Sequence, residues 1–262
     1  MLLSVTVNWA AVHWDFALIF LALATFVPWR GTVRARALRA QPRLGVGQRI
    51  SLYASTIAFQ WLGAAIIVWR AIARGLSPAE LGLLPAKPSL GIELGVLLAA
   101  ALGALQLTSL RLLSRVPAEK RGQLYEIAAK LMPQELTDGL VFVALVGTVS
   151  LCEELVFRGF VFAVLRNWSG SAALAIMGSS ALFALGHLYQ GRRGVVNTFV
   201  LGLVLAGARA WSDSLVPPIL AHLAIDLTAG LVGRHATKYS GSGADDASTG
   251  ATRAARLDGG AP

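Results

Sequence analysis

Six ionisable side chains stand inside otherwise apolar stretches in the C-terminal half of the chain. They are Glu153, Glu154, Arg158, His187, His222 and Asp226. A charged group at the centre of a bilayer costs roughly 3 kcal/mol on insertion scales, so such residues usually face a protein interior and mark a functional site. Carboxylates and imidazoles are also the groups that most often move protons in general acid–base catalysis. These six residues are therefore the first candidates for a catalytic or proton-handling site.

The spacing of the first three residues separates the roles of the two glutamates. On a helix, Glu154 and Arg158 are four residues apart and can form an ion pair across one turn. Glu153 is rotated by about 100° from Glu154 and has no local counter-charge. An unpaired carboxylate in an apolar site holds a proton more readily, which suits a general base. We therefore expect Glu153 to be the base; a purely structural pairing of both acids with Arg158 is the alternative.

The two histidines lie on two further apolar stretches. Phe183 and His187 are four residues apart, and so are His222 and Asp226. A single histidine in an apolar helix is more often a hydrogen-bonded core residue than a catalyst. Two histidines and several carboxylates on three stretches favour function, because each needs a partner in lipid and the simplest partners are one another. The pattern predicts one site shared by three helices.

Three motifs follow one another on these stretches: Glu-Glu-x-x-x-Arg at 153–158, Phe-x-x-x-His at 183–187 and His-x-x-x-Asp at 222–226. In this order they resemble the signature motifs of the CPBP family of intramembrane proteases. That family contains the type II CAAX prenyl endopeptidases and bacterial proteins of bacteriocin processing and self-immunity. The resemblance covers about 137–230, and it implies an endopeptidase that hydrolyses a peptide bond of a membrane-bound or lipidated, CAAX-like substrate.

The resemblance also implies a role for each residue. Glu153 would activate water with the assistance of His187, while Glu154 and Arg158 would orient the site. His222 and the residue four positions later would stabilise the oxyanion. That last position departs from the amide of the CAAX-processing members, because an ionised Asp226 cannot donate a hydrogen bond. Asp226 is then either protonated, or it orients His222 and favours the charged, donating form of that histidine.

A second mechanism places the same residues around a metal ion. Glu153 or Glu154, together with His187 and His222, would form a His₂Glu zinc site like those of soluble metalloproteases. The sequence contains no His-Glu-x-x-His motif that would decide between the two mechanisms. We favour the metal-free mechanism, in which the glutamate activates water.

The composition shows what kind of scaffold must position these residues. The chain has 262 residues, of which 55% are hydrophobic and only 14% charged, and its mean hydropathy is +0.63. A spanning helix needs about 20 apolar residues. Seven stretches qualify: 11–29, 50–72, 89–110, 137–157, 171–190, 194–211 and 214–233. We expect an all-α, polytopic membrane bundle of about seven transmembrane helices, or six if the first is peripheral.

The single cysteine, Cys152, excludes an intrachain disulfide and a cysteine-rich metal site.

The chain divides into three parts on this reading. Residues 1–136 hold N-terminal transmembrane helices and basic cytoplasmic loops, with an amphipathic surface helix between 114 and 136. Residues 137–233 form the catalytic core. Residues 234–262 lack apolar periodicity and are expected to be disordered.

The net charge of +9 could indicate nucleic-acid binding, but the placement of the charges favours membrane topology. Most of the 23 basic residues lie in alternate connections, including the arginines between 30 and 49, which we read as the first loop. The positive-inside rule then puts the N-terminus outside and the C-terminus in the cytoplasm. The Ala/Arg/Gly-rich composition suggests a bacterial plasma membrane. The expected partners are lipid and a membrane-bound or prenylated peptide, with no nucleic acid.

Two functions compete with proteolysis. A non-proteolytic membrane adaptor or immunity protein would keep the fold and hold a partner peptide. A transporter or proton relay could use the same buried acids and histidines, but the chain shows no paired halves. The expected spans also place His187 near the cytoplasmic end of its helix and His222 in the outer half. A shared site therefore requires tilted or broken helices, or a shifted fifth span.

Overall fold

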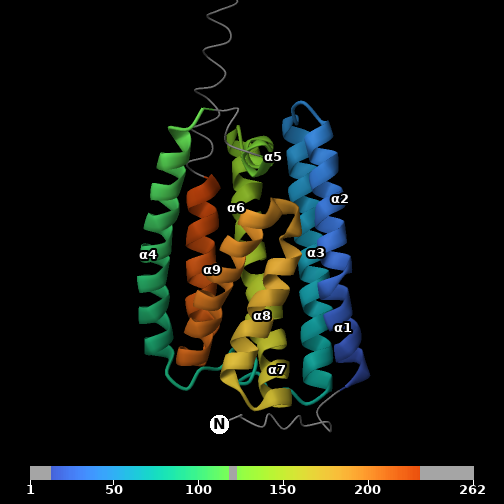
Figure 1. The fold of residues 1–262 in the computed structure, drawn as a ribbon, viewed down its shortest axis with the longest axis vertical. Helices are drawn as coiled ribbons and strands as arrows, with labels where there is room; N and C mark the ends of the chain where they lie inside the picture. Colours follow the sequence, from blue (N-terminus) through green and yellow to red (C-terminus); the bar gives the residue numbers. More distant parts are fainter. Residues whose placement is uncertain (1–12, 118–122, 231–262) are drawn as a thin grey trace, which may run out of the picture.

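The computed structural model describes residues 13–117 and 123–230, and within them all regular structure is helical (Figure 1). The elements in chain order are α1 (Trp14–Ala24), α2 (Phe26–Ala40), α3 (Val46–Ala73), α4 (Pro88–Ser114), α5 (Gln123–Leu131), α6 (Leu136–Glu154), the π-helix η3 (Leu155–Val161), α7 (Phe162–Ser169), α8 (Ala172–Gly186), the 3₁₀ turn η4 (Leu188–Gln190), α9 (Gly191–Ser212) and an unlabelled last helix, Val216–Gly230. The expected all-α polytopic bundle is confirmed. The predicted disordered tail, 234–262, lies outside the described residues.

Five helical segments of the described chain are long and apolar enough to cross a bilayer. They are Trp14–Ala40, Val46–Ala73, Pro88–Ser114, Leu136–Ser169 and Leu188–Ser212. The other two expected spans, 171–190 and 214–233, contain the shorter apolar helices Ala172–Gly186 and Val216–Gly230.

The fifth expected span is a broken helix. The 15 residues of α8 are about 22 Å long, less than the roughly 30 Å of a hydrocarbon core. The helix ends at Gly186, and His187 is followed by η4 and by Gly191, whose φ of 76° few residues other than glycine adopt. His187 therefore lies at a helix end beside the turn into α9, which is the break that a shared site requires.

The first basic segment is a helix rather than the predicted loop. Ala and Arg, which dominate 33–40, are strong helix formers, and α2 continues through them to Ala40, two residues before Pro42. Arg30 and Arg34 therefore lie on α2, and Arg49 lies in the first turn of α3.

Arg49 is a buried structural residue. Its Nε donates to Oδ2 of Asp138 at 2.6 Å, and both side chains are almost fully buried between α3 and α6. Asp138 also accepts the backbone N–H of Glu135 at 2.8 Å, while Nη1 of Arg49 donates to the carbonyl of Leu44. This pair ties the start of α3 to the start of α6, so Arg49 is no surface charge of a cytoplasmic loop.

A second ion-pair cluster joins α1 to α3. Oδ2 of Asp15 lies 2.5 Å from Nη2 of Arg70 and 3.1 Å from Nε of Arg74. The sequence suggests that Asp15 is a plain interfacial residue, yet the residue is buried. Its partners lie more than 50 residues away, so local sequence could not indicate them.

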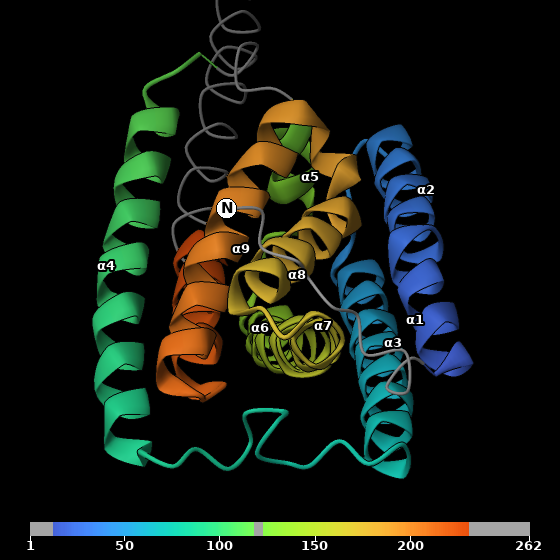
Figure 2. The ribbon, with the colours of Figure 1, turned by 60° about the horizontal axis from the view of Figure 1, so that its bottom comes forward.

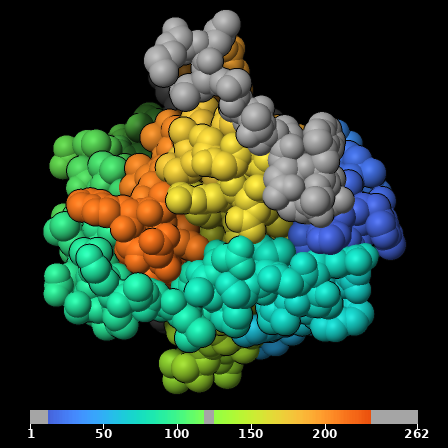
Figure 3. All heavy atoms as spheres, turned by 90° about the horizontal axis from the view of Figure 1, so that it is seen from below, coloured from blue at the N-terminus to red at the C-terminus, as the bar shows by residue number. Residues whose placement is uncertain are grey.

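The central layer of the bundle is formed by α6, α7, α8 and α9, with α3 packed along α6 and α4 at one edge beside α9 (Figure 2). The segment between α3 and α4 runs across one end of the molecule (Figure 3). Leu81 of this segment is buried, and the carbonyl of Gly82 accepts the N–H of Leu215 at 3.0 Å. A capping box forms here, in a turn: Ser77 N donates to Oε2 of Glu80 at 2.8 Å, and Glu80 N donates to Oγ of Ser77 at 3.2 Å.

Candidate active site

Glu154 is the centre of a buried charge network. It is the last residue of α6 and its side chain is fully buried. Its Oε1 accepts a hydrogen bond of 2.9 Å from Nη1 of Arg158 and one of 2.8 Å from Nδ1 of His222. The predicted pairing of Glu154 with Arg158 is present in the structure, and His222 joins the pair from the last helix.

A π-helical segment follows Glu154 directly. In η3 the N–H of Phe162 bonds to the carbonyl of Phe157, five residues earlier. Such segments often occur at functional sites inside α-helices. Here η3 carries Arg158 into the protein, where its side chain is fully buried and Nη2 lies 3.5 Å from the carbonyl of Gly202 on α9.

Glu153 points to a different neighbour. Its Oε1 accepts a hydrogen bond of 2.8 Å from Nε2 of Gln60 on α3, whereas its Oε2 is buried and has no hydrogen-bond partner in the described structure. Oε2 of Glu154 is also without a partner, but Glu154 already receives two donors on its other oxygen. The two adjacent glutamates therefore have different environments. Gln60 was not predicted, and the only available signal was an amide inside an apolar stretch.

His187 has a defined hydrogen-bond partner. Its Nδ1 lies 2.8 Å from the carbonyl oxygen of Phe183, one turn earlier on α8. Because a carbonyl can only accept, we assign the proton of a neutral His187 to Nδ1. Nε2 then has a free lone pair, which is the tautomer that a proton acceptor needs.

The buried ring of Phe183 connects the histidines to the charge network. The Cζ atom of Arg158 lies 4.2 Å from its centroid, in cation–π contact. The ring of His187 is 4.7 Å away and that of His222 is 6.0 Å away, centroid to centroid. Phe183 thus packs against three of the six predicted residues, although the motif pattern indicated only its place on the helix face of His187.

Asp226 completes the group at its outer edge. Its Oδ2 lies 3.6 Å from Nε2 of His222, an ion-pair distance that is too long for a hydrogen bond. The structure therefore links Glu154, Arg158, His222 and Asp226 in one network. Glu153 lies beside that network and accepts a hydrogen bond from Gln60. His187 contacts the ring of Phe183, which in turn packs on Arg158 of the network.

Comparison with known proteins identifies the segment that carries this site. Residues 135–228 match the family model of the type II CAAX prenyl endopeptidases, Rce1-like. This segment of the chain is therefore similar to the Rce1-like family. No curated protein and no solved structure matches the chain. The matched Rce1-like segment begins one residue before α6 and includes all six ionisable residues, whereas α1 to α5 lie outside it.

The Rce1-like segment does not present a metal-ligand set in this arrangement. Among residues 13–117 and 123–230, no group of three or more His, Cys, Asp or Glu side chains is placed to hold a metal ion. The predicted ligands Glu153, His187 and His222 do not form such a group, and the metal-bound alternative stays a prediction. We derive no catalytic step through a metal.

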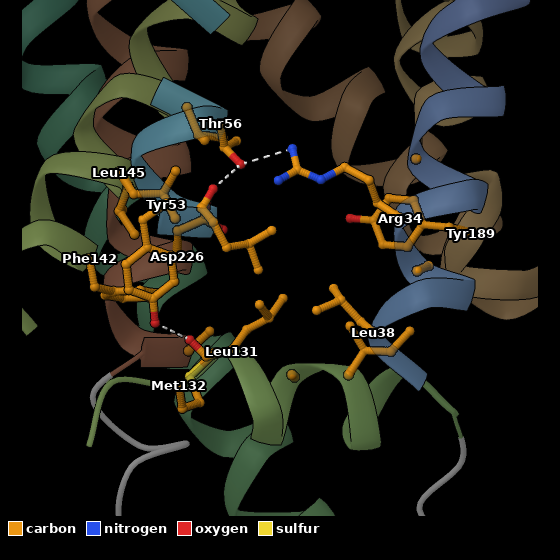
Figure 4. A pocket seen from close by; sticks show the side chains of 18 of the residues that line it. Arg34, Leu38, Tyr53, Thr56, Leu131, Met132, Phe142, Leu145, Tyr189 and Asp226 are labelled. Carbon is orange, nitrogen blue, oxygen red and sulfur yellow. Dashed lines mark hydrogen bonds between the residues drawn. The ribbon is translucent and has the colours of Figure 1, made fainter. Parts of the chain in front are cut away.

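A cavity of about 430 Å³ adjoins the Rce1-like site (Figure 4). Asp226 and Tyr189 line it, together with apolar residues of α2, α3, α5 and α6. Leu131 and Met132 lie at its α5 end, where the hydroxyl of Tyr53 donates to the carbonyl of Leu131. The volume and the mainly apolar lining are those of a ligand site, so the acidic end of the network opens onto a space that could hold part of a substrate.

Proposed function

We propose that this protein is an intramembrane endopeptidase that hydrolyses a peptide bond of a membrane-bound or lipidated, CAAX-like substrate by Glu/His-activated water. One observation carries the proposal: of two adjacent glutamates, Glu154 pairs with Arg158 and His222, whereas Glu153 accepts a hydrogen bond only from the neutral amide of Gln60 and its other oxygen is buried without a protein partner. Glu154 is suited to orient charges, and Glu153 is suited to receive a proton.

The first step is the attack of water on the substrate carbonyl. As the water oxygen bonds to the carbonyl carbon, its proton passes to Oε2 of Glu153, and the carbonyl π electrons move to the oxygen. The hydrogen bond from Gln60 holds the other oxygen of Glu153 in place. Nε2 of His187, free in the assigned tautomer, assists by accepting a hydrogen bond from the water. General base catalysis of this kind contributes about 10²- to 10⁴-fold to the rate.

The second requirement is a donor for the oxyanion. His222 lies between two carboxylates, Glu154 at Nδ1 and Asp226 at Nε2, which together stabilise the doubly protonated imidazolium. Its Nε2–H can then donate to the oxyanion, with Asp226 orienting the ring. When the tetrahedral intermediate collapses, the C–N bond breaks and the proton on Glu153 passes to the leaving nitrogen.

The decisive experiment compares detergent-purified wild type with Glu153→Gln on quenched peptides that include prenylated CAAX-type sequences. Products are identified by mass spectrometry. We expect a loss of at least about 10²-fold in kcat. Glu93→Gln, at an exposed position on α4, is the matched control and should cleave like wild type. Equal residual cleavage by Glu153→Gln and wild type would identify a contaminant. No cleavage by folded wild type would favour the adaptor function.

The same assay tests the metal-free mechanism. We expect 1,10-phenanthroline to leave the Glu153-dependent cleavage unchanged, because the proposed steps use only side chains and water. Loss of cleavage with the chelator and recovery on adding Zn²⁺ would replace this mechanism by a metal-dependent one.

We further propose that the C-terminus faces the cytoplasm of a bacterial plasma membrane. The end of α2, which carries Arg39, lies at the same end of the bundle as α5 (Figure 1), and the positive charge of α2 supports assigning that end to the inner face. The only native cysteine, Cys152, is fully buried, so introduced cysteines can be labelled selectively. A membrane-impermeant maleimide should label Leu84→Cys in intact cells, but Gln41→Cys only after permeabilisation. The reverse labelling would invert the orientation.

A further inference from the structure

The proposed reaction uses one donor for the oxyanion, the Nε2–H of His222. Asp226 lies beside it, with Oδ2 3.6 Å from that nitrogen, but an ionised carboxylate only accepts hydrogen bonds. Catalytic oxyanion sites commonly combine several preorganised donors, and removal of one lowers kcat by about 10²- to 10³-fold. A second donor is therefore expected among the other polar groups of the cavity that Asp226 lines.

Three hydroxyl groups line this cavity among the described residues, those of Tyr53, Thr56 and Tyr189. Tyr53 donates to the carbonyl of Leu131, and Thr56 donates to the carbonyl of Leu52 at 2.8 Å. The hydroxyl of Tyr189 has no acceptor in the part of the chain that the structure describes. Of these three protons, the one on Tyr189 is left unused by the fold.

The two arginines of the lining are engaged on α3. Arg34 donates from Nη1 to Oγ1 of Thr56 at 3.3 Å and from Nη2 to Oγ of Ser55 at 3.0 Å (Figure 4). Arg30 stacks on the ring of Phe59, with Cζ 3.7 Å from the centroid. These contacts direct both guanidinium groups to α3, which favours the phenol as the second donor.

Tyr189 is held on two sides. Nε2 of Gln190 donates to its hydroxyl oxygen at 3.3 Å, and Oε1 of Gln190 accepts from Oγ1 of Thr198 on α9, also at 3.3 Å. Because an amide nitrogen only donates, this contact occupies an oxygen lone pair and leaves the phenol proton available. On the other side, a Cβ at Gly31 of α2 would lie 3.2 Å from Cδ1 of the ring. The ring therefore packs closely on the α2 backbone, and the donor is preorganised.

The turn after α8 brings this donor to the reacting groups. Tyr189 lies in η4, two residues after His187, and the two ring centroids are 5.9 Å apart. Its side chain projects into the cavity, with the hydroxyl pointing inward (Figure 4). The charges of Glu153 and Asp226 both act on this hydroxyl. The break at the end of α8 thus places the proton acceptor His187 and a neutral donor on one short turn.

We propose that Tyr189 is a catalytic residue whose hydroxyl donates the second hydrogen bond to the oxyanion, together with the Nε2–H of His222. As water adds to the carbonyl carbon, the carbonyl oxygen gains the π electron pair and both hydrogen bonds strengthen. The phenol keeps its proton throughout, so the proton transfers to and from Glu153 are unchanged. This inference rests on the proposed function and adds a residue to the same site.

The first test compares the steady-state kinetics of wild type and Tyr189→Phe on a peptide whose cleavage depends on Glu153. We expect kcat to fall by about 10²-fold with KM close to that of wild type, because the hydrogen bond strengthens in the transition state. The ring and its packing on α2 are retained, so the thermal midpoint should stay unchanged. Tyr125→Phe removes a phenol hydroxyl from α5, outside the cavity lining, and should cleave like wild type.

The second test repeats Tyr189→Phe in the Asp226→Asn background. An asparagine amide donates where the carboxylate of Asp226 only accepts, so position 226 can then supply a second donor itself. We expect Tyr189→Phe to lower kcat by less than about 10-fold in this background, against about 10²-fold in wild type. A packing role for Tyr189 predicts the same ratio in both backgrounds, because Tyr189 and Asp226 form no hydrogen bond with each other in the described structure.

The other outcomes separate this inference from the proposed function. An unchanged kcat in Tyr189→Phe, with cleavage still lost in Glu153→Gln, would refute the oxyanion role and leave the protease standing. An equal loss in both backgrounds would also refute it and assign Tyr189 to packing. A raised KM at unchanged kcat would make Tyr189 a substrate-binding residue instead. Cleavage that does not depend on Glu153 would refute the proposed function, and the role of Tyr189 with it.

Discussion

The side-chain amide of Gln60 donates a hydrogen bond of 2.8 Å to Oε1 of Glu153, although 93 residues separate them in the chain. α3 packs along α6, and this contact brings an amide donor to the carboxylate that we propose as the general base. The carboxylate is thereby held at one oxygen and free at the other.

We predict that Gln60→Leu lowers kcat by about 10- to 100-fold with little change in KM. A hydrogen bond to a charged group contributes about 1.5–3 kcal/mol, and its loss lets the catalytic carboxylate rotate. Steady-state kinetics on a cleaved peptide check this. Gln106→Leu, which removes a half-buried amide from α4, should have no effect. An unchanged kcat for Gln60→Leu would mean that Glu153 is positioned by other groups.

The buried Arg158–Glu154 pair should show strong coupling. Arg158→Leu leaves a buried carboxylate with only His222 as a partner, and we expect it to lower the free energy of unfolding by about 3–5 kcal/mol. The double variant Glu154→Leu/Arg158→Leu removes both charges and should be more stable than the Arg158→Leu single variant. Denaturant unfolding in detergent measures both. A double variant less stable than Arg158→Leu would show that Glu154 stabilises the fold chiefly through His222.

The pair between Arg49 and Asp138 predicts that Arg49 is a structural residue. Arg49→Met should lower the free energy of unfolding by about 3–5 kcal/mol, because Asp138 would remain buried without its counter-charge. Arg43→Met makes the same substitution at an exposed position between α2 and α3, and it should change stability by less than about 0.5 kcal/mol. The two variants are compared by thermal unfolding. Equal stabilities would contradict the buried pair.

The contact between α8 and α9 predicts different effects at two glycines of α9. A Cβ at position 202 would lie 3.0 Å from Cβ and 3.2 Å from Cα of Ser180, so Gly202→Ala requires α8 to move by a few tenths of an ångström and should lower the free energy of unfolding by about 1–3 kcal/mol. A Cβ at Gly207 meets nothing within 4 Å. Gly207→Ala should therefore be neutral or stabilising, since alanine favours helix. The thermal unfolding midpoints of wild type and the two variants test this prediction. An unchanged midpoint for Gly202→Ala would refute the close packing of α8 on α9.

Much of the candidate site could be predicted because its signals are local. Glu154 and Arg158 are four residues apart, and a helical backbone brings such residues together whatever surrounds them. All six ionisable residues stand out for a related reason, since lipid penalises each one that lacks a polar environment. The break at His187 was required by the positions of the motifs along their helices, although no single residue indicated where α8 ends.

Other features depended on which helices pack together. Gln60 looked like a scaffold residue, and Arg30, Arg34 and Arg49 looked like charges of a loop. Their partners come from other helices or only from the assembled cavity, so the spacing of residues along one helix could not predict these contacts.

The sequence alone determined that this chain is a helical membrane protein. It also identified the six side chains that must face the protein interior rather than lipid, because hydropathy and helical periodicity can be read over a few turns of one helix. Tertiary structure decided that Glu154 pairs with Arg158 and His222, and that Glu153 accepts a hydrogen bond from the neutral amide of Gln60. It also decided that Arg30 and Arg34 face a cavity. These outcomes follow from long-range packing of the helices, which places side chains far apart in the chain within hydrogen-bonding distance.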